Sequence, residues 1–83
     1  MDVVYDSSKF TSRCFDDQAN GCAGLELFRT LLLEGAETQF VGRVIYWDAA
    51  GSWWVELAQE VPLLVLEKLV QEAKLAVFPN GEG

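Results

Sequence analysis

The clearest pattern of apolar and polar positions runs from residue 40 to residue 58 and predicts a β-hairpin. Residues 40–47 are rich in the β-branched and aromatic types that strands favour. A second apolar run follows in residues 52–57. Between the two runs, Asp48 and Gly51 stand where a type I turn favours aspartate and glycine. We therefore expect a hairpin with a three-residue loop, residues 49–51.

This loop would place Asp48 opposite Ser52 and would decide which side chains share a face, because side chains alternate along a strand. One face would carry Arg43 at its edge and then Ile45, Trp47, Trp53, Val55 and Leu57. The other face would carry Val44, Tyr46, Trp54 and Glu56. A slip of one residue would change this division, so it depends on the turn.

The residues after Val61 predict an amphipathic helix over residues 62–77. Pro62 suits the first helical position, where its missing N–H costs no hydrogen bond. The apolar stripe recurs at steps of three and four and consists of Leu63, Leu66, Val70, Ala73 and Val77, joined by Leu69 and Ala76. We expect Leu66 to pack on the sheet near Trp53, with Lys68 and Glu72 outside that contact.

The first forty residues allow two interpretations. Asn20-Gly21 is a strong signal for a tight turn, and it would join a strand over residues 9–17 to one that begins at Cys22, with Ala19 opposite Cys22. Residues 25–34 have types that favour a helix. A hairpin alone is marginally stable, however, so the fold favours a third strand there. Both interpretations stay open, with the strand slightly preferred.

Together these elements predict an α+β fold in a single domain over residues 1–83. The domain would have an antiparallel sheet of three or four strands with the C-terminal amphipathic helix packed on one face. Residues 1–8 and 79–83 are expected to fray at its ends.

The charge balance removes several classes of function. Six basic and 13 acidic residues give a net charge of −7, which disfavours nucleic acids and anionic membranes. The chain has no histidine, so Ser-His-Asp and Cys-His catalysis are excluded. Cys14 and Cys22 are too few for a zinc site without histidine. We expect both to be reduced in a cytoplasmic protein, because acidic residues stand where a signal peptide would be basic. No cofactor is expected.

An aromatic cluster is the feature that rises most above this background. Four of the ten aromatic residues, Tyr46, Trp47, Trp53 and Trp54, fall within nine positions. Core packing under the helix accounts for Trp47 and Trp53. Tyr46 and Trp54, on the other expected face, would be open to water unless residues 25–34 form a second helix over them.

These observations predict a non-enzymatic protein–protein interaction module. We expect it to form a homodimer through an interaction face made of Val44, Tyr46, Trp54 and Glu56, and a host protein is a further candidate partner. The alternative is a small-ligand binder or minor enzyme with a pocket near Trp54, Tyr46 and Glu56. There the apolar surroundings would raise the pKa of the Glu56 carboxyl.

The hairpin and the helix together also resemble a group of bacterial proteins. Residues 41–51, Val55-Glu56, Val61-Pro62-Leu63 and residues 66–74, which lie within a stretch of about two fifths of the chain, resemble small stand-alone bacterial proteins of unknown function. Some of those proteins are carried on plasmids and integron gene cassettes. The resemblance implies no catalytic residues.

Overall fold

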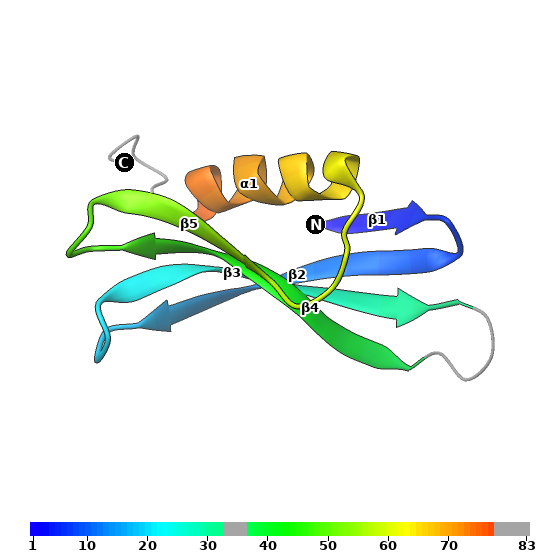
Figure 1. The fold of residues 1–83 in the computed structure, drawn as a ribbon, viewed down its shortest axis with the longest axis horizontal. Helices are drawn as coiled ribbons and strands as arrows, with labels where there is room; N and C mark the ends of the chain where they lie inside the picture. Colours follow the sequence, from blue (N-terminus) through cyan, green and yellow to red (C-terminus); the bar gives the residue numbers. More distant parts are fainter. Residues whose placement is uncertain (33–36, 78–83) are drawn as a thin grey trace.

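The computed structural model describes residues 1–32 and 37–77, which form one antiparallel sheet and one helix (Figure 1). The elements in chain order are β1 (Asp2–Tyr5), β2 (Ser8–Asp17), β3 (Cys22–Leu31), β4 (Thr38–Trp47), β5 (Ser52–Leu57) and α1 (Leu63–Val77). The strands lie in the sheet in the order of the sequence, each antiparallel to the next. The α+β class is confirmed. The expected three or four strands are wrong, because the sheet has five.

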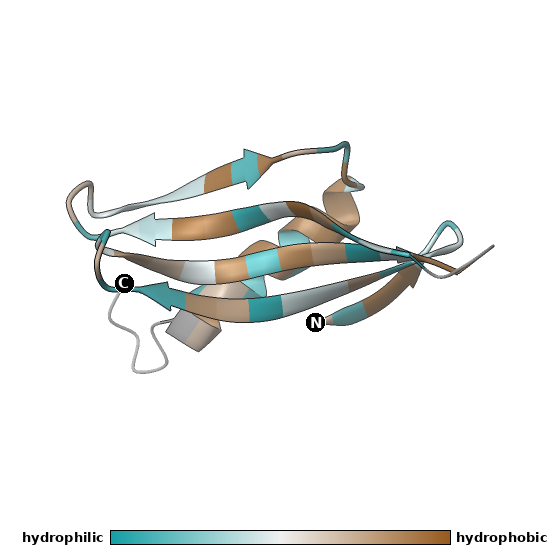
Figure 2. Ribbon diagram, turned by 90° about the horizontal axis from the view of Figure 1, so that it is seen from below, coloured by the Kyte–Doolittle hydropathy of each residue, from teal (hydrophilic) through white to brown (hydrophobic). Residues whose placement is uncertain are grey.

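The helix covers one face of the sheet and leaves the other uncovered. It contacts β2, β3 and β4, and it lies above the sheet in Figure 1. Figure 2 shows the sheet from below, with the strands in front of the helix. The buried core lies between the two layers and consists of Phe10, Leu25, Leu27, Val41 and Val44 from the sheet and Val65, Leu69 and Ala73 from the helix.

The helix meets the sheet through a stripe rotated from the predicted one. Val65, Leu69 and Ala73 repeat at four-residue steps and are all fully buried. Leu66 packs partly buried against this core, as expected, and so does Trp53. Leu63, which the periodicity placed in the stripe, is 69% exposed. The side chain of Val77 lies outside the described part of the chain.

The ambiguous segment after Cys22 is a strand. Residues 25–31 belong to β3, the central strand, which pairs with β2 on one side and β4 on the other. Leu25 and Leu27 face the helix and are fully buried. Tertiary packing overrides the helical preference of these residue types, because a strand paired on both sides buries more of its backbone and side chains than an isolated helix would. Glu34, at the end of the segment, lies outside the described residues.

The strand β1 occupies residues that were expected to fray. Asp6 and Ser7 turn the chain from β1 into β2 with positive φ angles of 47° and 60°. Positive φ at both turn positions is the geometry of a tight two-residue hairpin, here without the usual glycine. Val3 then packs against the core and orders the strand. The expectation for residues 79–83 concerns residues outside the described part.

Both long hairpins close in a different register from the predicted one: the partner of Ser52 is shifted by one residue, from Asp48 to Trp47, and the partner of Cys22 by two, from Ala19 to Asp17. Their loops have four residues, 18–21 and 48–51, and end in Gly21 and Gly51 with φ of 68° and 64°. Asp17 therefore pairs with Cys22, and Trp47 pairs with Ser52. The glycine occupies the left-handed region as the last loop residue, so the ladder begins after it.

Candidate functional site

The uncovered side of the sheet, which we call the open face, carries a row of four charged residues, one from each of β2, β3, β4 and β5. Arg13 of β2 is paired with Glu26 of β3, Glu26 with Arg43 of β4, and Arg43 with Glu56 of β5. These four residues form a straight row of alternating sign, which we call the charge row. The Arg13 guanidinium lies 3.2 Å from Glu26, and Arg43 Nε donates to Glu56 Oε1 over 3.0 Å.

Aromatic side chains lie on one side of the charge row. Phe28 and Phe40 meet edge to face there, with ring centroids 5.9 Å apart. The Arg13 guanidinium lies over the Phe28 ring at 5.3 Å, within the range of a cation–π contact. Phe40 is 40% exposed. The Phe28 ring therefore contacts the arginine, while part of the Phe40 surface stays in water.

A second apolar group lies on the other side of the charge row. Phe15, Gly24, Ile45 and Trp54 occupy successive strands in one register line. Gly24 has no side chain, so the Arg43 guanidinium reaches the Phe15 ring at 5.6 Å. Ile45 is 3% exposed on this face, whereas Trp54 is 57% exposed and donates its indole N–H to Ser52. The open face thus combines a small apolar cluster with a large exposed indole.

The four residues of the expected interaction face do not share a face. Trp54 and Glu56 lie on the open face, while Val44 and Tyr46 face the helix side with Trp53. Val44 belongs to the core, and Tyr46 meets Trp53 edge to face at 5.4 Å. The cause is the four-residue loop, since moving the register by one residue exchanges the faces of one strand relative to the other.

The pocket expected near Trp54, Tyr46 and Glu56 is corrected for the same reason. Tyr46 lies on the opposite side of the sheet from the other two residues. Glu56 is not held among apolar side chains, because its side chain is 61% exposed and is paired with Arg43. The apolar surroundings expected around Glu56 are therefore absent.

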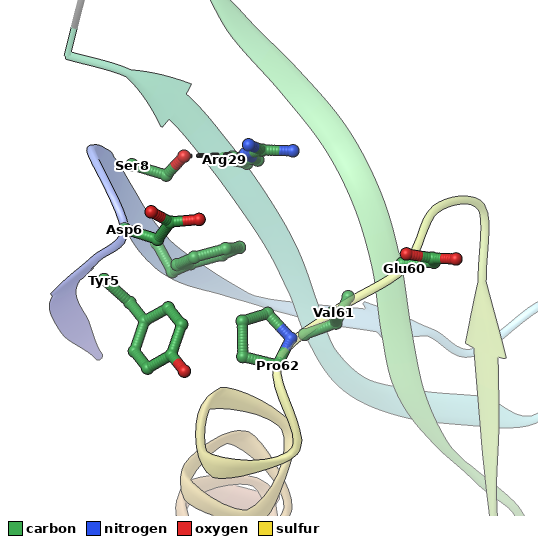
Figure 3. Close-up of a pocket in the computed structure, with 8 residues that line it drawn as sticks. Tyr5, Asp6, Ser8, Arg29, Glu60, Val61 and Pro62 are labelled. Atoms are coloured by element: carbon green, nitrogen blue, oxygen red, sulfur yellow. Dashed lines mark hydrogen bonds between the residues drawn. The ribbon is translucent and has the colours of Figure 1, made fainter.

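A cavity of about 370 Å³ lies where the β1–β2 turn approaches the start of α1 (Figure 3). Its lining is Tyr5, Asp6, Ser8, Phe10, Arg29, Glu60, Val61 and Pro62. Ser8 is 1% exposed, and its hydroxyl accepts a hydrogen bond of 2.8 Å from Arg29 Nε. Asp6 and Glu60 line the cavity together with Arg29, so the lining carries charges of both signs.

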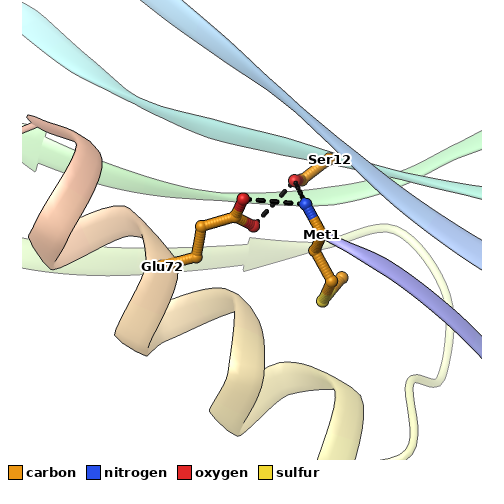
Figure 4. Close-up of polar contacts among 3 residues, drawn as sticks. All are labelled: Met1, Ser12 and Glu72. Atoms are coloured by element: carbon orange, nitrogen blue, oxygen red, sulfur yellow. Dashed lines mark hydrogen bonds and ion pairs between the residues drawn. The ribbon is translucent and has the colours of Figure 1, made fainter.

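A polar cluster joins the first residue to the helix (Figure 4). The Met1 ammonium donates to Glu72 Oε2 over 2.7 Å and to the Ser12 hydroxyl over 2.8 Å. Ser12 in turn donates to Glu72 Oε1. Partial burial opposes the charge of Glu72, but the two hydrogen bonds and the nearby ammonium together lower the pKa of its carboxyl. Glu72 was expected outside the helix–sheet contact, and it is instead part of it.

The cysteines are both free thiols, and they lie on different surfaces. Cys14 is exposed, while Cys22 is 5% exposed. Burial, with Asp17 nearby, raises the pKa of the Cys22 thiol. Within residues 1–32 and 37–77, no group of three or more acidic, cysteine or histidine side chains is arranged to hold a metal ion. None of the helices in that part has the length and apolar character needed to span a membrane.

Sequence reasoning missed the charge row. Its four members lie 13, 17 and 13 positions apart, and nothing in that spacing marks them as neighbours. The row becomes visible only when the registers of three strand pairs are known.

Comparison with known proteins found no matching family model, no similar curated protein and no similar solved structure.

Proposed function

We propose that this protein is a non-enzymatic protein–protein interaction module that associates with a second copy of itself through the open face. The observation that carries the proposal is the exposure of Trp54 and Phe40 on a sheet face that no described element covers. An aromatic side chain buries about 150–250 Å² when it is covered. A partner that covers these rings would therefore gain a substantial apolar contact.

The charge distribution favours a second copy as the partner. The net charge of −7 would repel another copy through most of the surface. On the open face, three of the six basic residues stand among four acidic ones, so this surface is close to neutral. Its seven charged members are Lys9, Arg13 and Arg43 with Asp2, Asp17, Glu26 and Glu56. Two copies that meet through this face would therefore repel each other less than the net charge of the chain suggests.

A dilution series with one variant tests the proposal. Trp54→Glu places a charge at the most exposed aromatic of the open face, and it should give a folded monomer. Leu63→Glu is the matched control, because Leu63 is 69% exposed on the helix and lies away from the open face. Sedimentation equilibrium, with far-ultraviolet circular dichroism as the check of folding, measures both.

We expect the wild type to pass from dimer to monomer on dilution, and the Leu63→Glu variant to follow it. A wild-type protein that stays monomeric at high micromolar concentration would contradict self-association. A dimer that survives Trp54→Glu but dissociates with Leu63→Glu would place the interface on the helix side instead.

A further inference from the structure

The charge row has a symmetry that specifies how two open faces fit together. Read from β2 to β5, its signs are positive, negative, positive, negative, carried by Arg13, Glu26, Arg43 and Glu56. Read from β5 to β2, the signs are negative, positive, negative, positive, so each position has the sign opposite to that in the forward reading. A row of this kind is complementary to its own reversed copy.

We propose that two copies stack open face to open face about a twofold axis that runs parallel to the strands and passes between β3 and β4. This inference rests on the proposed self-association and adds its geometry. The axis lays β2 of one copy over β5 of the other, and β3 over β4. Arg13 then meets Glu56 of the second copy, and Glu26 meets Arg43 of the second copy, so all four interchain contacts join opposite charges.

The alternative twofold axis in the plane between the sheets brings like charges of the charge row into contact. A twofold axis that is perpendicular to the strands and runs along the charge row lays each strand over its own equivalent, so that Arg13 meets a second Arg13 and Glu26 a second Glu26. Like charges in contact across an interface weaken association strongly. Packed sheets keep their strands within about 30° of one another in the aligned arrangement, which the parallel axis satisfies.

The same axis also brings together the aromatic residues on both sides of the charge row. Phe28 of β3 would lie against Phe40 of β4 in the second copy, next to their existing pair within each chain. On the other side of the charges, Phe15 of β2 would lie against Trp54 of β5. The two most exposed aromatic residues of the open face, Trp54 and Phe40, therefore each gain an aromatic partner.

The size of the face fits an interface of standard type. Three of the overlapping strands have ten residues and β5 has six; at a rise of about 3.3 Å per residue and a spacing of about 4.8 Å, these four strands present roughly 570 Å² before side chains are counted. A standard interface buries about 800 Å² on each partner. Four strands overlap about the proposed axis, and the short β1 lies outside the overlap.

Charge reversal at the two ends of the row tests the axis. Arg13→Glu alone sets two acidic groups against each other in the dimer, and Glu56→Arg alone sets two arginines against each other. Each variant should weaken self-association by more than about tenfold. An equimolar mixture of the two variants restores opposite charges at all four contacts. The mixture should therefore form a heterodimer with close to wild-type affinity.

Two further variants complete the design. Lys68→Glu changes the net charge as Arg13→Glu does, but it lies on the helix, so it should keep the wild-type affinity. The double variant Arg13→Glu/Glu56→Arg should recover association with itself, because its reversed ends again meet with opposite sign. Native mass spectrometry of the mixture, with sedimentation equilibrium for affinity, distinguishes heterodimer from homodimer. Circular dichroism confirms that each variant folds.

The possible results separate this inference from the proposed function. A monomeric wild type would refute both. A wild-type dimer that Trp54→Glu dissociates, but whose charge-reversed variants do not recover on mixing, would refute the axis and keep the open face as the interface. Recovery on mixing and in the double variant would support the axis, since a loss of folding stability would not be repaired by a second chain.

Discussion

Leu69→Ala should destabilise the protein more than any exposed substitution on the same helix. Leu69 is fully buried between Val65 and Ala73, facing the core leucines of β3. The substitution removes three carbon atoms, each worth about 0.8 kcal/mol when buried, which gives roughly 2.4 kcal/mol. The cavity that remains raises the expected loss to about 2.5–5 kcal/mol. A chain of this length has a total stability of roughly 4–12 kcal/mol, so the variant should be close to unfolding.

Urea titration followed by tryptophan fluorescence measures the free energy of unfolding. The protein concentration must be the same for all variants, because self-association adds to apparent stability. Leu63→Ala is the control, since it makes the same chemical change at a side chain that is 69% exposed. It should change the free energy of unfolding by less than about 0.5 kcal/mol. Equal losses from the two variants would show that the helix does not meet the sheet through Val65, Leu69 and Ala73.

Two further predictions concern the titratable groups. Glu72→Gln should lower the free energy of unfolding by about 0.5–1 kcal/mol near neutral pH, because it removes a partly exposed ion pair with Met1. Folding lowers the pKa of this carboxyl from its ordinary 4.5. The extra free energy of unfolding of the wild type over Glu72→Gln is therefore present above that pH and disappears as the pH falls through the folded-state pKa. Urea titrations in which the two proteins kept the same difference in free energy of unfolding in acid would contradict this. Timed alkylation followed by mass spectrometry should label the exposed Cys14 first. The reaction of Cys22 should be slower, because its thiol is buried and has a raised pKa, so it reacts only when the protein opens. Labelling of both cysteines at the same rate would contradict the structure.

Strong local patterns predicted the elements near the C-terminus. The apolar residues on both sides of Asp48 and Gly51 indicated the β4–β5 hairpin, and the structure has it. The helix begins at Leu63, one residue after the predicted start. Its apolar side was assigned from spacing alone, and the stripe was displaced because leucines and valines occur on nearly every side of this helix. Spacing does not say which of them the sheet will cover.

Which side chains lie together on the open face was beyond the reach of the sequence. An aspartate followed three residues later by glycine fits a three-residue loop and a four-residue loop equally well. The choice between them decides whether Tyr46 or Ile45 lies opposite Trp54, and with it every later assignment of a face. The strand β1 was missed because its turn, Asp6-Ser7, lacks the glycine that marks such turns.

The order of the strands has a consequence for how the chain folds. Each strand pairs with its neighbour in the sequence, so every step in building the sheet closes only a short connection, and little chain entropy is lost before contacts form. Such a topology has a low contact order for a β-rich protein, which favours rapid folding. The helix comes last in the chain and rests on β2, β3 and β4, whose pairing does not require it. We therefore expect the meander to assemble as one cooperative unit and the helix to dock late, with low φ-values in α1 and higher ones in the β3–β4 pair.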